Sequence, residues 1–412
     1  MIGTRAGGMT NPPLRIGCNV STAGQSRYPY HVNVVDTAGG ATGVGQVGAT
    51  LGVEEEFHLL DPDTGDLVPA ARRVLLRDPT DAGPELQRST VETASGVHTG
   101  LADLRRDLLA RRRELADAAA SLGLAVASVG TVPASGTRRS RVFPDRRYEW
   151  LAAEYRQLVD EQQVCACQVH VRVDDRDLAV RITRRIRGWL PALLAMSASS
   201  PFFQGEDTGY ASYRTVVVSR WPTVGPPPDF ACAADYDRTV ATLIRSGVIS
   251  DAGMIYFDAR LSAHYPTVEI RVADACPAVD DAVLIAALAR ALVVTAARAD
   301  AATADRAPGA GPPESPQVLA RAATWRAARS GLDGQLLDPY AIRAVPAGQV
   351  VHALLDHVRP VLEERGEWAQ VTPLAEALLA RGPSARRQRA AFDQGSSPVE
   401  VVAGLAAETT AG

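Results

Sequence analysis

The chain has 412 residues, of which 46% are hydrophobic and 22% charged, and its formal net charge is −4. This is the composition of an ordinary soluble globular protein, and so small a net charge speaks against a nucleic-acid partner. All 43 basic residues are arginine. The absence of lysine excludes a lysine-dependent phosphate loop and a Schiff base, so arginines or metal ions must hold any bound phosphate.

The five cysteines are scattered along the chain. An odd, scattered set argues against a disulfide scaffold and fits a reducing compartment. No apolar run reaches membrane-spanning length, and the N-terminus has no signal-like apolar core. We therefore expect a cytoplasmic protein without a membrane partner.

Residues 1–48 are rich in Gly, Thr, Asn and Pro and lack periodicity, which predicts a flexible N-terminal extension. We expect the remaining chain, residues 49–410, to form one domain whose C-terminal part is helical.

Alternation of apolar and polar residues with period two predicts strands with one buried face. In the first, Leu51, Val53, Phe57 and Leu59 form an apolar face that only Glu55 interrupts. The predicted strands, in chain order, are Leu51–Leu60, Leu124–Thr131, Cys165–Asp174, Tyr210–Trp221, Met254–Leu261 and Thr267–Ala273. Cys165 and Cys167 fall on an apolar face, so we interpret them as small core residues.

Apolar residues at helical spacing predict helices between these strands. The predicted helices are Leu101–Leu122, Asp175–Ser197 with a bend or restart at Pro191, and Val279–Ala299. Beyond residue 316 the pattern is mainly helical. Because the order of elements is irregular and the strands are one-sided, we predict an α+β fold. Its mainly antiparallel sheet carries helices on one face and leaves the polar face open.

The polar faces of three predicted strands carry ionisable side chains: Glu54 and Glu56, His170, and Glu269 with Arg271. Two carboxylates that point the same way repel each other unless a cation or a proton lies between them. Carboxylates with an imidazole suit Mg²⁺ or Mn²⁺, which also bind phosphate oxygens. For a single strand, a merely solvated polar face explains the pattern equally well, but it explains three such strands less well.

Arginines recur at even spacing in two further predicted strands. Arg214 and Arg220 would share one face of Tyr210–Trp221, and Tyr256 and Arg260 one face of Met254–Leu261. Converging arginines bind phosphates and carboxylates. For any one of them a surface ion pair is the simpler interpretation.

Several motifs, taken in order, resemble the glutamate–cysteine ligase type 2 family of carboxylate–amine ligases. The resemblance spans about residues 50–406 and is carried by Gly52–Phe57, Asp61–Gly65, Val91–Gly96, Cys165–His170, Ser200–Gly205, Asp207–Arg214, Ser219–Pro222, Asp258–Ser262 and Pro266–Asp274. Family members often have His where this chain has Gln168, which puts the tuning of the site or its substrate choice in doubt.

The resemblance implies a glutamine-synthetase-like catalytic fold, in which a curved antiparallel sheet holds divalent ions and ATP in an open funnel. It implies metal ligands at Glu54, Glu56, Glu85, Glu92, His170 and Glu269. It also implies catalytic roles for Arg214 and Arg271, and substrate or ATP contacts at Tyr213, Arg214, Arg220, Arg260 and Arg271.

The expected activity is that of a glutamate–cysteine ligase, an ATP-dependent enzyme that forms a carbon–nitrogen bond between an acid and an amino acid. ATP, glutamate and cysteine would give γ-glutamylcysteine, ADP and phosphate through an acyl phosphate, with Mg²⁺ or Mn²⁺ as cofactor. The alternatives are a ligase for another acid and amine, a metal-dependent hydrolase and a non-catalytic binding protein. The helical C-terminal part could supply a homodimer interface or cover the sheet.

Overall fold

A seven-stranded sheet forms the centre of this computed structural model, which describes residues 46–133, 141–303 and 315–412. Six strands follow the order β2-β3-β1-β5-β9-β8, β4 pairs with β1, and every pairing is antiparallel. The strands are β1 (Leu51–Leu60), β2 (Gly83–Pro84), β3 (Thr90–Ala94), β4 (Ala125–Ala127), β5 (Cys167–Arg172), β8 (Ala259–Leu261) and β9 (Thr267–Ile270). Most of the predicted extension, residues 1–45, lies outside the described residues.

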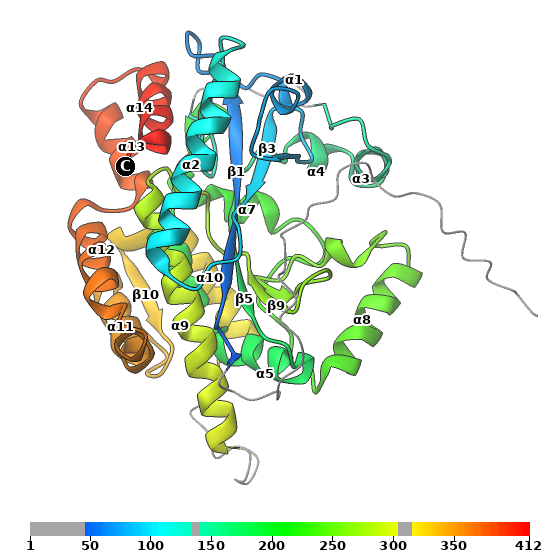
Figure 1. Cartoon of the computed structure of the whole chain (residues 1–412), viewed down its shortest axis with the longest axis vertical. Helices are drawn as coiled ribbons and strands as arrows, with labels where there is room; N and C mark the ends of the chain where they lie inside the picture. Colours follow the sequence, from blue (N-terminus) through cyan, green and yellow to red (C-terminus); the bar gives the residue numbers. More distant parts are fainter. Residues whose placement is uncertain (1–45, 134–140, 304–314) are drawn as a thin grey trace, which may run out of the picture. The chain divides into compact units, whose positions relative to one another are not determined.

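Helices cover the apolar face of the sheet. Val53, Val169 and Val268 are buried on that face, and the long helices α2 (Leu101–Ala120) and α9 (Val279–Thr303) pack beside them (Figure 1). Around α9 pack α5 (Arg176–Ile186), α6 (Leu190–Ser197), α11 (Ala347–Glu364) and α12 (Trp368–Arg381). The predicted α+β fold, with helices on one face of a mainly antiparallel sheet, is therefore confirmed.

The remaining elements lie around this core or at its ends. They are α1 (Ala71–Leu75), α3 (Arg146–Tyr155), α4 (Gln157–Asp160), α7 (Tyr213–Val218), α8 (Ala233–Arg245), α10 (Gln317–Ser330), α13 (Ser384–Asp393) and α14 (Pro398–Thr410), with the short hairpins β6–β7 (Phe202–Phe203, Glu206–Asp207) and β10–β11 (Gln335–Asp338, Arg343–Pro346). Among the described residues, α9 alone is long and apolar enough to cross a membrane, and 83% of its most apolar window is buried in the protein.

Several sequence predictions match the observed elements. Strand β1 occupies the predicted range, and Cys165 and Cys167 are buried as core residues. The helix predicted over 175–197 is interrupted and restarts as α6, with Pro191 in its first turn, where proline loses no helical hydrogen bond.

The strand predicted over Tyr210–Trp221 is wrong, because this segment contains helix α7. The Ser212 side chain accepts a hydrogen bond from the Thr215 backbone N–H and so caps the first turn. Four other strands are shorter than predicted. Only Ala125–Ala127 of Leu124–Thr131, Cys167–Arg172 of Cys165–Asp174, Ala259–Leu261 of Met254–Leu261 and Thr267–Ile270 of Thr267–Ala273 form strands.

Candidate functional site

Three side chains from adjacent strands meet on the open face of the sheet. In the antiparallel register, His170 on β5 lies opposite Glu269 on β9, and Glu54 on β1 lies opposite Gln168, two residues from His170 on β5. One ligand atom from each of Glu54, His170 and Glu269 lies within 4.8 Å of the other two. The period-two pattern of three separate strands thus produces one cluster, which we call the Glu-His-Glu cluster.

The His170 ring is oriented by its two neighbours. Nδ1 lies 3.0 Å from Oγ1 of Thr267, and Nε2 lies 3.3 Å from Oε1 of Glu54. Burial lowers the pKa of His170, but the carboxylates of Glu54 and Glu269 outweigh it and raise the pKa above its ordinary value. A contact that occupies Nδ1 leaves Nε2 facing the carboxylates, which is the arrangement of a metal-binding histidine.

Glu269 stays ionised because two arginines hold it. Arg260 donates to both of its oxygens, at 2.8 and 2.9 Å, and Arg271 donates to Oε1. Although burial raises the pKa of Glu269, Arg260 and Arg271 hold it well below its usual range. Arg260 also donates to the backbone oxygens of Gly253 and Ile255, so its side chain positions Glu269 and has little freedom to reach a substrate.

A second acidic group adjoins the cluster and comprises Glu56, Glu85 and Glu92. Glu56 lies opposite Glu92 in the β1–β3 register. Burial, followed by the charge of Glu85, raises the pKa of Glu56 to about 7. Burial and the neighbouring carboxylates also raise the pKa of Glu92 well above its ordinary value, and burial is the main cause of the raised pKa of Glu85.

Gln168 connects these groups. Its amide nitrogen donates to Glu56 at 2.9 Å and lies 3.5 Å from Glu92, while its amide oxygen accepts from Arg271. An amide can donate to a carboxylate and accept from a guanidinium at the same time. Gln168 therefore fills the place of the family's frequent histidine with contacts on both sides.

The donor set fits hard divalent cations. Carboxylates that repel each other in a buried site become stable as anions when a cation lies between them. The oxygens of Glu54, Glu56, Glu85, Glu92 and Glu269, with one imidazole nitrogen, are ligands that Mg²⁺ or Mn²⁺ accepts. The predicted metal ligands are thus brought together on one face of the sheet.

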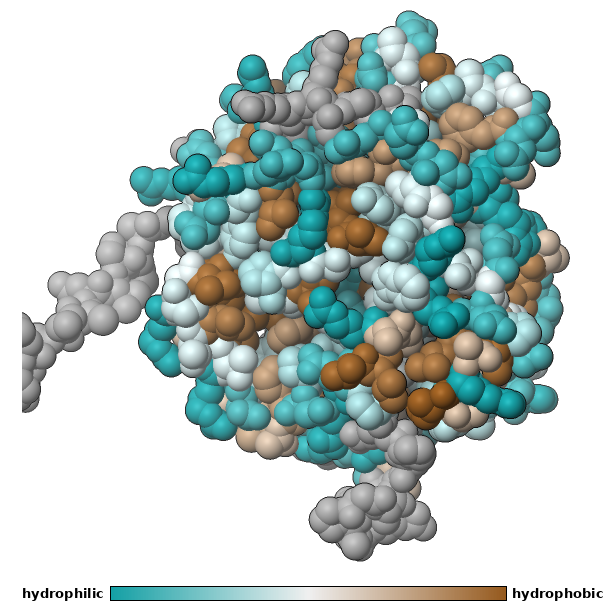
Figure 2. Space-filling view, turned by 180° about the vertical axis from the view of Figure 1, so that it is seen from behind, coloured by the Kyte–Doolittle hydropathy of each residue, from teal (hydrophilic) through white to brown (hydrophobic). Residues whose placement is uncertain are grey.

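A cavity of about 250 Å³ opens beside the two acidic groups. Glu56, Glu85 and Arg271 line its border with them, and Figure 2 shows the hollow in the surface seen from behind. The wall combines aromatic and arginine side chains, including Arg147, Tyr148, Arg214, Trp221, Tyr256, Arg321 and Trp325. Arg271 also lies over the Tyr256 ring, at 5.8 Å from its centroid.

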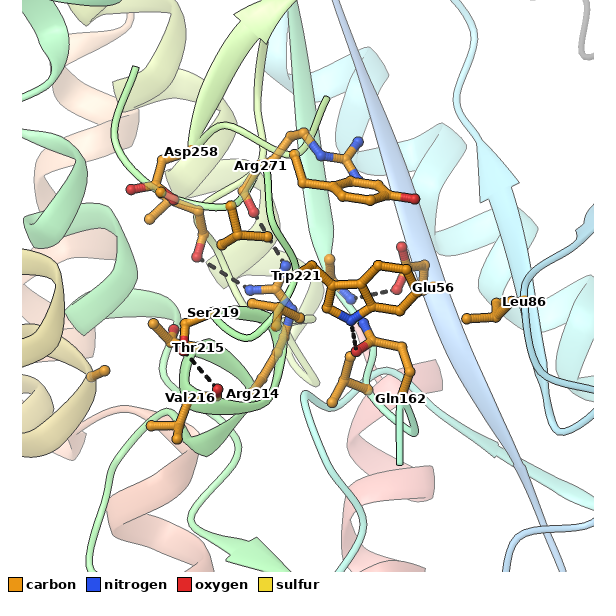
Figure 3. A pocket seen from close by; sticks show the side chains of 18 of the residues that line it. Glu56, Leu86, Gln162, Arg214, Thr215, Val216, Ser219, Trp221, Asp258 and Arg271 are labelled. Atoms are coloured by element: carbon orange, nitrogen blue, oxygen red, sulfur yellow. Dashed lines mark hydrogen bonds between the residues drawn. The ribbon is translucent and has the colours of Figure 1, made fainter. Parts of the chain in front are cut away.

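The other predicted substrate residues have different surroundings. Arg214 lines the cavity and donates to the backbone oxygens of Arg271 and Val272 (Figure 3). Arg220 lies beyond the helical part of α7, is paired with Glu161 and does not line the cavity. Tyr213 packs against Phe203, also away from the cavity lining. For Arg220 and Tyr213 a substrate contact stays a prediction.

Three of the charged cavity residues were not singled out from the sequence: Arg147, Asp258 and Arg321. Asp258 lies within a motif that carries the family resemblance, and this motif is the only feature of the sequence that points to a functional role for it. Arg147 and Arg321 belong to α3 and α10, and nothing in their local sequence distinguishes them from ordinary helix-surface arginines.

Comparisons with solved structures agree with this architecture. A glutamate–cysteine ligase of Francisella tularensis, solved in complex with AMP, superposes with a TM-score of 0.66 at 11% identity and covers 88% of this chain and 89% of that chain. A bifunctional glutathione synthetase of Pasteurella multocida gives a TM-score of 0.63 at 16% identity, over 89% of this chain and 53% of that chain. At such identities the likeness shows the fold alone.

Curated proteins found by sequence are more similar to this chain than these solved structures are. A Mycolicibacterium smegmatis protein, provisionally named glutamate–cysteine ligase 2-2, is 47% identical over 87% of this chain and 90% of its own length. A provisional glutamate–cysteine ligase 2-2 of Frankia casuarinae is 49% identical over 87% of this chain, and the match spans only 41% of that longer relative. The family model described as glutamate-cysteine ligase family 2 matches residues 50–402. The chain therefore belongs to glutamate–cysteine ligase family 2.

Proposed function

We propose that this protein is an ATP-dependent ligase that joins the γ-carboxylate of glutamate to the amine of cysteine through an acyl phosphate. The observation that carries this proposal is the Glu-His-Glu cluster of Glu54, His170 and Glu269, whose ligand atoms lie within 4.8 Å of one another beside a cavity lined by arginines. Family membership supports the reaction class, and the cluster supports a metal-dependent use of ATP.

The chemistry requires activation, because a carboxylate is a poor electrophile at neutral pH. A bound divalent ion, Mg²⁺ or Mn²⁺, would neutralise phosphate charge and align the phosphoryl group. Glu54, His170 and Glu269 would hold one such ion, and the carboxylates of Glu56, Glu85 and Glu92 would complete the site.

Arg271 lies between the metal-binding groups and the cavity. It contacts Glu269 and Gln168 and lines the cavity wall. Its charge is therefore positioned to stabilise the transferred phosphoryl group where that group meets the substrate carboxylate. The buried Arg214 adds a second positive charge that backbone oxygens hold in place, so little reorganisation is needed during the reaction.

The cavity wall also protects the acyl phosphate. Leu86, Val164, Val216 and Trp221 contribute apolar surface to the cavity wall. An apolar wall limits the access of water, which would otherwise hydrolyse the activated carboxylate.

The direct test is ADP formation by the purified chain with Mg²⁺, ATP and glutamate, measured with and without cysteine. We expect ADP formation to depend on cysteine, and Glu54→Gln to lower turnover by about 100-fold or more because a charged metal ligand is lost. Glu54 is a better choice than Glu269, whose loss would leave Arg260 and Arg271 unpaired.

The matched control is Asp63→Asn, the same chemical change at an exposed turn after β1. Wild-type turnover in Glu54→Gln would remove this residue from the metal site. A panel of other acids and amines tests the alternative that the ligase joins a different pair of substrates. Metal-dependent hydrolysis without nucleotide would instead favour a hydrolase.

A further inference from the structure

A buried carboxylate lies in the cavity wall away from the metal-binding groups. Asp258 precedes β8 and is 8% exposed. Its backbone is held on both sides: its N–H donates to the Gly225 oxygen at 2.8 Å, and its carbonyl accepts from the Arg271 N–H at 2.9 Å. In Figure 3, Asp258 and Glu56 appear on opposite sides of the view, with Trp221 and Arg214 between them.

The side chain of Asp258 is only partly satisfied. It accepts a hydrogen bond from the Thr324 side chain, but Oδ2 is buried without a hydrogen-bond partner among the described residues. Burial raises the pKa of this carboxyl to about 7, although Arg214 opposes the shift. A buried polar atom without a partner costs free energy, so a cationic or hydrogen-bonding group of a ligand is the natural complement.

A positive side chain accompanies Asp258 at the exposed edge of the same cavity. Arg321 on α10 lines the cavity, is exposed, and is near enough to Asp258 to lower its pKa. In the described part of the chain we find no ion pair or hydrogen bond of the Arg321 side chain. One buried, partly satisfied carboxyl group and one uncommitted positive group therefore face a single cavity.

We propose that Asp258 binds the α-ammonium group, and Arg321 the α-carboxylate, of the amino acid whose side-chain carboxylate is activated. This inference rests on the proposed ligase function and names the residues that select its acid substrate. An ammonium group held by a carboxylate is protonated and is not a nucleophile. An amino acid bound in this way therefore supplies the carboxylate, and the attacking amine comes from the other substrate.

The adenine ring of ATP is the competing occupant of this part of the cavity. The aromatic wall would suit adenine, whose amino group can donate to a carboxylate, but a neutral base carries no pair of opposite charges to match a buried carboxylate and a guanidinium together. The charge pattern therefore favours the zwitterionic end of an amino acid.

Two glutamate analogues separate the two contacts. Glutarate lacks the α-ammonium group and 4-aminobutyrate lacks the α-carboxylate, and both keep the carboxylate that is activated. We expect the wild-type protein to prefer glutamate over either analogue. Asp258→Asn should raise the KM for glutamate at least tenfold and abolish the preference over glutarate, with KM values for ATP and cysteine within twofold of wild type.

Arg321→Gln is the second variant, and it keeps a polar side chain at an exposed position, so the fold does not depend on the residue that is replaced. It should abolish the preference for glutamate over 4-aminobutyrate and keep the preference over glutarate. A raised KM for ATP in Asp258→Asn would assign the site to adenine, a raised KM for cysteine alone would assign it to the amine substrate, and unchanged preferences would assign it to neither. Each of these three results overturns the proposal.

The proposal can fail separately from the ligase function. If the wild-type chain forms ADP and both variants keep its preferences, the ligase function stands and the assignment of Asp258 and Arg321 is wrong. If no amine-dependent ADP forms, calorimetric titration of glutamate into wild type and Asp258→Asn still measures the binding site. Equal affinities in that titration would overturn the proposal, and weaker binding to the variant would support it.

Discussion

Glu55 lies at the one position where the apolar face of β1 carries a charge, and its partner is Arg112 of α2. Both side chains are almost fully buried. Arg112 donates to the two carboxylate oxygens at 2.9 and 2.5 Å and also to the backbone oxygens of Cys276 and Pro277. Each donor therefore replaces a lost contact with water, which is the condition for a stable buried ion pair.

Removing one partner should be costly. Arg112→Met is expected to lower the free energy of unfolding by about 3–5 kcal/mol, because Glu55 would remain buried without a counter-charge. Urea denaturation measures this change. Arg113→Met at the exposed neighbouring position is the matched control and should change stability by about 0.5 kcal/mol or less. Equal effects of the two substitutions would mean that the pair contributes nothing specific.

His58 predicts a pH dependence of stability. It is fully buried, and burial lowers its pKa from 6.5 to about 4, although a backbone contact with Gly130 opposes the shift. Between these pH values the unfolded chain binds a proton that the folded chain does not. The free energy of unfolding should therefore fall as pH drops from 6.5 to 4, by about 1.4 kcal/mol per pH unit at most.

His58→Gln removes this titration and should flatten the stability curve between pH 6.5 and 4. Urea denaturation at several pH values measures the slope, which does not depend on any uniform loss of stability in the variant. If the stability curves of the two proteins run parallel between pH 6.5 and 4, folding does not lower the pKa of His58.

At the scale of single elements, α7 shows why local pattern can mislead. Its valines at alternate and adjacent positions favour a strand by propensity, yet the Ser212 cap and the packing of Val217 in the core select a helix. Arg214 belongs to the first turn of this helix, whereas Arg220 follows its C-cap, Ser219. The even spacing of the two arginines therefore does not place them on one face, and only Arg214 lines the cavity.

Helix α14 depends on a capping box at Ser397. The Ser397 hydroxyl accepts from the Glu400 N–H, and the Glu400 carboxylate accepts from the Ser397 N–H at 2.8 Å. Ser397→Ala should lower stability by about 1 kcal/mol, measured by denaturation, because an N-terminal N–H of the helix loses its partner. Ser396→Ala, one residue earlier, keeps the box and should be nearly neutral.

At the scale of the whole molecule, α9 joins the sheet to the helical C-terminal part. It packs against β5 and β1 on one side and against α11 and α12 on the other. The C-terminal helices therefore cover α9, and through it the sheet, which is one of the two roles considered for them. A homodimer stays a prediction.

A substitution that leaves an empty space beside α9 should lower the stability of the entire fold. Leu288→Ala, at a position with no exposed surface, should lower the free energy of unfolding by about 2–5 kcal/mol. Leu76→Ala, the same change at a side chain that is 75% exposed, should be nearly neutral. A small effect at Leu288 in denaturant unfolding would show that the helices around α9 close the space left by the removed side chain.

The sequence by itself determined five of the seven strands of the sheet and most of the candidate metal-binding groups, whereas β2 and β3 were not predicted. Period-two alternation is a local steric property of extended chain, so it placed Glu54, Glu56, His170 and Glu269 on polar faces before any contact between strands was known. The order of the motifs identified the family, and with it the acids Glu85 and Glu92.

Tertiary structure alone decided what lies in the cavity and beneath the sheet. Glu55 and Arg112 are 57 residues apart, and Arg260 holds Glu269 from the neighbouring strand. Asp258 faces Arg321 from a different element. These contacts depend on how separate elements pack, and the local spacing of residues does not predict them. Helix α7 owes its form partly to the same cause, because the burial of Val217, together with the local Ser212 cap, outweighed the strand preference of its valines.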